Sequence, residues 1–329
     1  MKLVMKNSYK TYIKKLNLTI KELEKLPLHE IDENRFLLKV AFDIAYENDI
    51  FSLYLYDKEI QDKLKFKLFS KLTKLSGSLT FLAIQILAAN SIMNKNNFKK
   101  KEYFFEKKCG IAINHLRATK TYVSAKKCDC GYKLDGVLTW ASGYKIFDHL
   151  LIGFHFEGKE FEVLTKFEKS NSFKIIDTPE VFVGQSLNTI NVKLEDFFVE
   201  DENIVSSQQR GNYTKNKSLS KTVHYAIYGL SLGALKLIED ETLKSKTKKK
   251  LKKIKKRFLE TNDGNELDEL RIKLFNLTQK IITLNMILKG GKSILKEKTL
   301  QRYYRELIMF NANGLNDKIK NLYLKDFNS

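Results

Sequence analysis

Apolar residues repeat with a helical period at both ends of this 329-residue chain, and they alternate with polar residues in its middle. The period changes near residue 109 and changes back near residue 219. Apolar residues three or four positions apart predict an amphipathic helix, whereas strict alternation predicts a half-buried strand. We therefore expect an α+β multidomain chain in which a helical part, a β part and a second helical part follow one another.

Residues 1–108 are expected to form an N-terminal helical domain. Apolar residues recur at helical spacing over residues 16–25, 35–56 and 62–75. The run from Leu79 to Met93 is apolar on all sides, which predicts a central helix that is buried on most sides. Because this run contains polar residues and is too short to cross a bilayer, we expect no membrane span.

Residues 109–206 are expected to form a central β domain, either a small barrel or a sandwich. The alternating residues 150–155 and 161–167 flank the sequence Glu-Gly-Lys at 157–159, a pattern typical of a β-hairpin. Alternation continues over residues 173–183. Short alternating segments with turn residues between them indicate that this part of the chain is all-β.

Residues 207–329 are expected to form a C-terminal four-helix bundle. Four stretches of helical periodicity are separated by short turns, which is typical of an up-down bundle. They are Leu219–Glu239, Thr247–Glu260, Glu266–Leu288 and Thr299–Asp326.

The formal net charge of the chain is +20. Such a charge attracts phosphates on nucleic acid, lipid or a cofactor. In the densest basic run, Lys244–Arg257, a helix would place Leu251 and Ile254 on one stripe and lysines around the rest. The Lys-, Asn- and Ile-rich composition of an AT-rich genome explains solvent-facing lysines more simply. We therefore do not expect a nucleic-acid partner, although a phosphate-binding role stays open.

The three cysteines, Cys109, Cys128 and Cys130, do not form a disulfide framework, and no His/Cys cluster completes a metal site near them. The first residues contain no apolar run of the signal-peptide type. We therefore expect a cytoplasmic protein with reduced thiols and no metal.

Residues 131–143, GYKLDGVLTWASG, resemble a segment of the acyl-CoA dehydrogenase superfamily. In that family a Trp covers one face of the flavin, and a Ser or Thr two positions later hydrogen-bonds the flavin ring. The resemblance thus implies that Trp140 and Ser142 bind FAD. From the residues alone, a core Trp beside a surface Ser is the plainer alternative. Residues 76–93 and 194–206 also resemble family segments, but they mark topology rather than chemistry.

Residues 288–306, LKGGKSILKEKTLQRYYRE, resemble the family's glycine-rich segment. Gly290, Gly291 and Arg305 keep the family spacing, and Glu306 replaces the usual Asp. In the family the paired glycines let the backbone approach the ADP half of the cofactor, often across a subunit interface. The resemblance therefore implies a homodimer or homotetramer. An ordinary helix–helix turn is the alternative for the two glycines.

The carboxylate base of the acyl-CoA dehydrogenases has no counterpart in this chain. In the family a glutamate removes an α-proton from the acyl thioester while hydride leaves for the flavin. At the usual position of that glutamate stands Asn313 or Gly314, and neither can act as a base. Some members carry the glutamate in the first bundle helix, where His224 is the only titratable candidate here. A half-buried helix histidine is the plainer interpretation of His224.

Residues 109–117, CGIAINHLR, replace the family's acidic loop that contacts the flavin. In that loop His115 and Arg117 are of interest, because Arg117 would pair with a phosphate of FAD or of an acyl carrier. A strand end at the surface is the plainer alternative. The family segment whose Arg binds cofactor phosphates is replaced by the lysine-rich run.

The resemblance as a whole implies an FAD-dependent oxidoreductase that acts on an acyl-CoA or acyl-carrier thioester and passes electrons to a partner protein. The missing glutamate favours a variant reaction, such as flavin monooxygenation, over ordinary CH–CH dehydrogenation. Two alternatives are a non-catalytic binding protein and a nucleic-acid-associated flavoprotein on the same scaffold. The sequence leaves the substrate, its chain length and the electron acceptor open.

Overall fold

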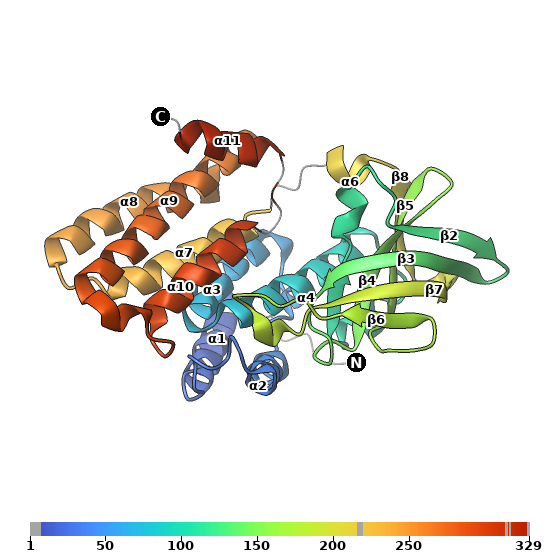
Figure 1. Cartoon of the computed structure of the whole chain (residues 1–329), viewed down its shortest axis with the longest axis horizontal. Helices are drawn as coiled ribbons and strands as arrows, with labels where there is room; N and C mark the ends of the chain where they lie inside the picture. Colours follow the sequence, from blue (N-terminus) through green and yellow to red (C-terminus); the bar gives the residue numbers. More distant parts are fainter. Residues whose placement is uncertain (1–7, 216–219, 313–314, 316, 328–329) are drawn as a thin grey trace.

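The computed structural model describes residues 8–215, 220–312, 315 and 317–327. Helices come first, strands follow, and helices end the chain (Figure 1). This order confirms the predicted fold class, an α+β chain with an N-terminal helical part, a central β part and a C-terminal helical bundle. The limits of the three predicted domains stay a prediction.

The N-terminal part consists of α1 (Tyr9–Leu23), α2 (Arg35–Glu47), α3 (Lys58–Leu75), α4 (Gly77–Lys95) and α5 (Lys101–Phe105). Helix α4 lies between the helices α1 to α3 and the strands (Figure 1). The Ser76 hydroxyl caps α4 by accepting a hydrogen bond from the Leu79 N–H at 3.1 Å. In the described part of the chain α4 alone is long and apolar enough to cross a membrane, and 67% of its apolar window is buried inside the protein. Such burial suits a central core helix.

The strands are β1 (Cys109–Ala112), β2 (Val123–Cys128), β3 (Gly131–Ala141), β4 (His149–Phe156), β5 (Lys159–Lys166), β6 (Phe173–Asp177), β7 (Ile190–Glu200) and β8 (Ile204–Gln209). They form one sheet in the order β6-β7-β3-β2-β4-β5-β8, and β1 pairs in parallel with β4. Tyr132 of β3 packs against Phe154 and Phe161 of the β4–β5 pair, with ring centroids 5.2 and 5.5 Å apart. Since β2 separates β3 from β4 in the sheet, this contact shows that the sheet folds over a common core.

The predicted hairpin is confirmed by the antiparallel pairing of β4 with β5. Glu157 and Gly158 at its turn both have positive φ angles, 44° and 73°. Two consecutive residues of this kind make the tight turn whose twist matches that of the flanking strands.

The predicted alternation over residues 173–183 is wrong beyond β6, because residues 178–184 contain no strand. Pro179 in this segment has no N–H with which to join a sheet. The carbonyl of Phe182 accepts a hydrogen bond from Arg305 at 2.8 Å. The segment is therefore fastened to the C-terminal helices and not to the sheet.

The C-terminal part consists of α6 (Asn212–Lys215), α7 (Thr222–Lys236), α8 (Glu241–Glu260), α9 (Gly264–Lys289), α10 (Thr299–Ala312) and α11 (Asp317–Phe327). Helices α7 to α10 form the predicted bundle, and α7 also packs on α3 (Figure 1). The prediction of one helix over Thr299–Asp326 is wrong, since α10 and α11 are separate. Leu315, the one described residue between them, belongs to no helix.

Candidate functional site

Trp140 lies at an irregular point of β3, where the register with β7 shifts between Leu138 and Ala141. Its φ angle is +60°, and its backbone N–H donates to Asn191 Oδ1 at 2.9 Å. Its side chain is 60% exposed. A bulge of this kind re-aims a side chain. The structure therefore holds a large flat ring at the surface on a strained backbone.

The residues after Trp140 are fixed by the segment that precedes β7. The Oγ of Ser142 lies 2.8 Å from Thr189 Oγ1, and both side chains are buried. The N–H of Gly143 donates to the Leu187 carbonyl at 2.7 Å. Gly143 has a φ angle of +85°, and a Cβ there would lie 2.3 Å from the Phe147 ring, so this position requires glycine.

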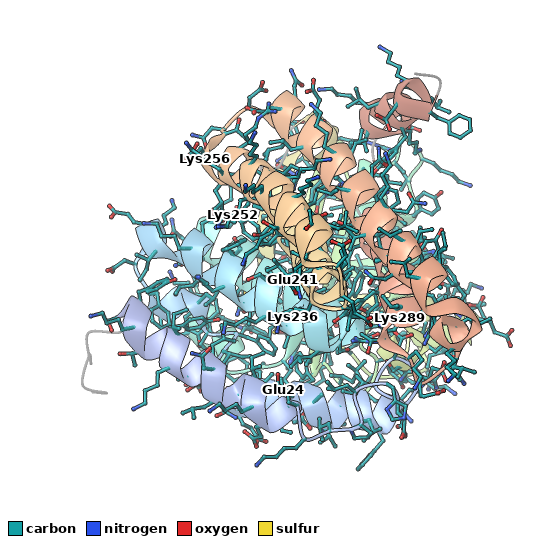
Figure 2. All side chains as sticks on the ribbon, turned by 90° about the vertical axis from the view of Figure 1, so that its left-hand side faces the viewer. Glu24, Lys236, Glu241, Lys252, Lys256 and Lys289 are labelled. Atoms are coloured by element: carbon teal, nitrogen blue, oxygen red, sulfur yellow. The ribbon has the colours of Figure 1, made fainter. Side chains whose placement is uncertain are left out.

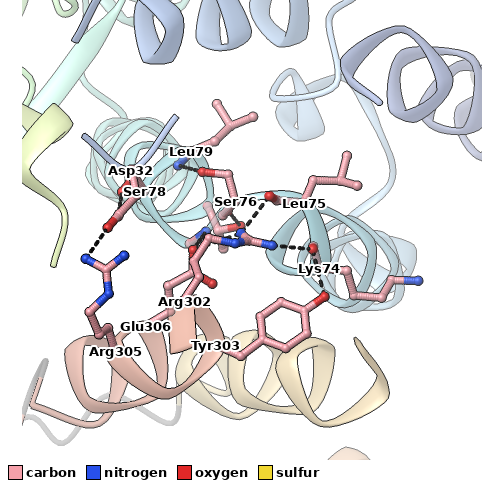
Figure 3. Close-up of polar contacts among 12 residues, drawn as sticks. Asp32, Lys74, Leu75, Ser76, Ser78, Leu79, Arg302, Tyr303, Arg305 and Glu306 are labelled. Atoms are coloured by element: carbon pink, nitrogen blue, oxygen red, sulfur yellow. Dashed lines mark hydrogen bonds and ion pairs between the residues drawn. The ribbon is translucent and has the colours of Figure 1, made fainter. Parts of the chain in front are cut away.

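A buried carboxylate joins this segment to α10 and α4 (Figure 3). Asp32 is 1% exposed, and its Oδ1 accepts hydrogen bonds from Ser78 Oγ at 2.7 Å and from the Gly184 N–H at 3.0 Å. Arg305 on α10 places Nη1 3.2 Å from Asp32 Oδ2. The same guanidinium holds the Phe182 carbonyl. The loop that leads toward Thr189 is therefore tied to the helical core.

Glu306, which follows Arg305, is sealed inside the protein with 0% exposure. Its Oε1 accepts hydrogen bonds from the Gly77 N–H at 2.7 Å and from Arg302 Nη1 at 3.0 Å (Figure 3). Arg302 also donates to the Leu75 carbonyl at 2.6 Å. Burial, the largest cause, raises the pKa of Glu306 to about 7, while the Arg302 charge opposes the rise. These contacts connect α10 to the α3–α4 junction.

Gly290 and Gly291 lie where α9 ends and a short 3-10 turn, Gly290–Ile294, begins. Gly290 has a φ angle of +65°. A Cβ at either glycine would meet no described atom within 4 Å. Large apolar side chains around the pair are exposed, namely Ile287, Leu288, Ile294 and Leu295. The glycines thus open a surface that the described part of this chain does not cover.

Arg117 lies in a 3-10 turn, Asn114–Arg117, which follows β1. Its guanidinium carbon is 5.4 Å from the centre of the Tyr213 ring. In the same turn His115 Nε2 lies 2.9 Å from the Gly153 carbonyl of β4, and burial lowers the pKa of His115. This turn therefore packs between β4 and α6.

His224 is buried in the core of the bundle, 4% exposed, and its Nε2 donates to the Leu267 carbonyl at 2.7 Å. Its ring lies 5.8 Å from that of Phe258. Burial lowers its pKa to about 4, so it is neutral and weakly basic near neutral pH. This environment favours a structural role. Asn313 and Gly314 lie outside the described residues.

Trp140 on β3 and Ser142, directly after β3, thus lie two residues apart in one segment, whereas Gly290, Gly291, Arg117 and His224 belong to other elements. Sequence reasoning missed Thr189 and Asn191, which hold the Trp140 segment. It also missed Asp32 and Arg302. Of these, only Arg302 could have been found in the sequence. It lies three residues before Arg305, so the two arginines are neighbours on one face of the predicted helix.

The sequence matches no protein-family model and no curated protein. Solved structures do match the fold. Glutaryl-coenzyme A dehydrogenase in complex with glutaryl-CoA superposes with a TM-score of 0.75 at 12% identity, over 96% of this chain and 94% of that one.

Two other solved structures, KijD3 and a hydroxylase, match the fold equally widely. KijD3 in complex with FMN and a dTDP-linked amino sugar matches with a TM-score of 0.74 at 11% identity, over 97% of this chain and 93% of that one. The 3-HSA hydroxylase from Rhodococcus sp. RHA1 matches with a TM-score of 0.70 at 12% identity, over 95% and 94%. Helices, sheet and bundle therefore match over nearly the whole length of each chain, and this protein has the acyl-CoA dehydrogenase fold.

Proposed function

We propose that this protein is a flavin-dependent oxidoreductase that binds the ring of FAD against the indole of Trp140. The observation that carries the proposal is the exposed indole on a backbone with a φ angle of +60°. Such strain costs about 1–3 kcal/mol and is common where a side chain serves a ligand. Matched structures hold FMN or act on an acyl-CoA, which supports the same chemistry on this fold.

The residues around Trp140 fit a flat, mostly apolar ring with polar edges. The indole offers a broad apolar face for stacking. The hydroxyl groups of Ser142 and Thr189 bond to each other, and the one that accepts in this pair has a hydrogen left that can be donated to a ring nitrogen. The Gly290 N–H donates to the Ile287 carbonyl, whereas Gly291 has no side chain that would keep a pyrophosphate away from the backbone there. When bound, the flavin would supply two-electron redox chemistry, and the chain would supply stacking, hydrogen bonds and exclusion of water.

The buried carboxylates do not fit the role of a catalytic base. A base must come within hydrogen-bond reach of the proton that it removes. Glu306 is 0% exposed and Asp32 is 1% exposed, and both are held by arginines. His224, with a pKa of about 4, is closed off in the bundle core. We therefore infer a reaction that needs no protein carboxylate, such as oxygenation by reduced flavin, in preference to ordinary α,β-dehydrogenation.

We infer an acyl thioester substrate, carried by coenzyme A or by a carrier protein, and an electron-transfer partner in the cytoplasm. The uncovered apolar residues beside Gly290, such as Ile287 and Leu288, suit contact with a second copy of the chain. A homodimer or homotetramer would then place the glycine pair near a cofactor shared between subunits.

The test is the visible spectrum of the purified protein before and after incubation with FAD. We expect flavin absorbance that stays with the protein through gel filtration. Anaerobic addition of a medium-chain acyl-CoA should leave the bound flavin oxidised, because Asp32 and Glu306 are buried and cannot reach the α-proton. Rapid bleaching would contradict the variant reaction, and a protein that takes up no FAD would support a non-catalytic scaffold.

A further inference from the structure

Helix α8 carries a share of the positive charge that composition does not explain. Its 20 residues include ten Lys or Arg and two Glu. The chain as a whole has 59 Lys and Arg against 39 Asp and Glu. Codon usage in an AT-rich genome would enrich lysine everywhere, so it does not account for this local excess of eight positive charges. The local excess therefore favours a surface function for α8 over a merely solvated face.

The charges on α8 occupy one continuous side of the helix. Its buried residues, Thr247, Leu251 and Phe258, form a stripe that faces α7 and α9. At 100° per residue, the opposite side carries lysines over an arc of roughly 200°. We call this side the α8 lysine face; its exposed members are Lys246, Lys248, Lys249, Lys250, Lys252, Lys253 and Lys256.

Acidic residues leave the α8 lysine face unneutralised. Among the described residues, two cations of α8 form ion pairs with acidic side chains. They are Lys244 with Glu241 and Arg257 with Glu266. Neither cation belongs to the α8 lysine face. Figure 2 shows Lys252 and Lys256 on the outer side of α8, and Lys236 on the same side of the molecule. The surface thus presents a run of free ammonium groups.

We propose that the α8 lysine face binds the phosphate backbone of double-stranded nucleic acid without sequence preference. From Lys246 to Lys256 the face is about 15 Å long, at 1.5 Å per residue. A duplex offers about one negative charge per 1.7 Å of axis, so several lysines can contact phosphates at once. The face has no exposed aromatic or large apolar residue. Stacking on single strands and insertion into a membrane both need such residues.

The position of α8 makes this activity compatible with the proposed flavin site. Helix α8 lies at the end of the molecule opposite the β-sheet (Figure 1). A duplex on α8 therefore leaves Trp140 on β3 uncovered. Composition alone predicts solvated lysines on this face and no nucleic-acid partner.

The test measures binding of a fluorescent duplex of about 30 base pairs to the full chain, over salt concentrations from ~50 to ~200 mM. In one variant Lys249, Lys252, Lys253 and Lys256 become Gln. The matched control changes four exposed lysines at the β-sheet end of the molecule to Gln. Lys126, Lys133 and Lys159 lie on strands, and Lys169 lies in the loop between β5 and β6. Both variants lose the same formal charge, so only the location differs.

We expect the α8 variant to bind at least about tenfold more weakly and its salt slope to fall by ~0.9 per lost phosphate contact, with the control unchanged. A further variant with Arg at the four α8 positions should retain binding, which separates charge from misfolding. Equal losses in both Gln variants would overturn the proposal, because net charge alone would explain them. Absence of duplex binding by the unaltered protein would also overturn it, as would binding only to phosphatidylserine vesicles.

Discussion

The guanidinium of Arg305 on α10 forms an ion pair with the buried carboxylate of Asp32, at 3.2 Å from Nη1 to Oδ2. Asp32 also accepts hydrogen bonds from α4 and from the Gly184 N–H. Three segments far apart in the sequence therefore meet at one carboxylate. Since the proposed site depends on the segment that follows Gly184, this pair should matter for both stability and cofactor binding.

Replacing Arg305 by Met leaves Asp32 buried without its cation. We expect the free energy of unfolding in urea to fall by about 3–5 kcal/mol, the usual cost of breaking a buried pair from one side. The double variant with Asp32→Ala should lose less than the sum of the single losses. As a control, Glu168→Gln breaks an exposed pair with Lys166 and should cost less than about 1 kcal/mol. Equal losses for both pairs would show that burial does not matter here.

Glu306→Gln should change how stability depends on pH. Burial raises the pKa of Glu306 from 4.5 to about 7, so the folded protein holds a proton that the unfolded chain releases. Stability from this group is present below pH ~4.5 and is lost as pH rises to about 7, by on the order of 3 kcal/mol. The Gln variant should lack that decline. Urea titrations at several pH values test this, and parallel profiles for the two proteins would contradict it.

His224→Gln should have the opposite effect on the pH profile. Burial lowers the pKa of His224 from 6.5 to about 4, so the unfolded chain binds a proton that the folded protein refuses. The contribution of His224 to the stability of the fold is present above pH ~6.5 and is lost as the pH falls toward 4. A Gln amide can still donate to the Leu267 carbonyl but does not titrate. Relative to the unaltered protein, the variant should gain about 3 kcal/mol between pH ~7 and ~4. If the variant gains no stability relative to the unaltered protein over this range, the pKa of His224 is the same in the folded and the unfolded protein, which would contradict the account.

The sequence predicted the order of elements well because apolar periodicity reports which faces are buried. The alternation through β4 and β5 and the apolar run of α4 are both confirmed. The pattern failed over residues 178–184, where apolar residues alternate without joining the sheet. Alternation shows that side chains face two environments, but it does not identify the backbone partner, which here is Arg305.

Less of the candidate site could be predicted. Trp140 and Ser142 were identified by resemblance, and their roles stay a prediction. Thr189 and Asn191 had no local signal, because their contacts depend on how β7 pairs with β3. Asp32 lies in a loop with no motif around it, and its importance follows from three partners that only the tertiary fold assembles.

The two glycines at the end of α9 should respond differently to Ala. Gly290 has φ +65° and ψ −157°, a region that is nearly closed to other residues, so Gly290→Ala should cost about 1–3 kcal/mol. Gly291→Ala meets no described atom and should leave the melting temperature unchanged. If the backbone at Gly291 approaches the cofactor, Gly291→Ala should bind FAD about tenfold more weakly even though its melting temperature is unchanged. FAD affinity equal to that of the unaltered protein would argue against this contact.

FAD titration of the unaltered protein beside Trp140→Asn tests the flavin proposal most directly. Asn tolerates a φ angle of +60° better than Trp, and the exposed indole contributes little burial, so the variant should fold with equal or higher stability. We expect the unaltered protein to bind FAD and the variant to lose at least about tenfold in affinity, the value of one aromatic stacking contact. Equal FAD affinity in the two proteins, or none in either, would contradict a flavin ring held at Trp140.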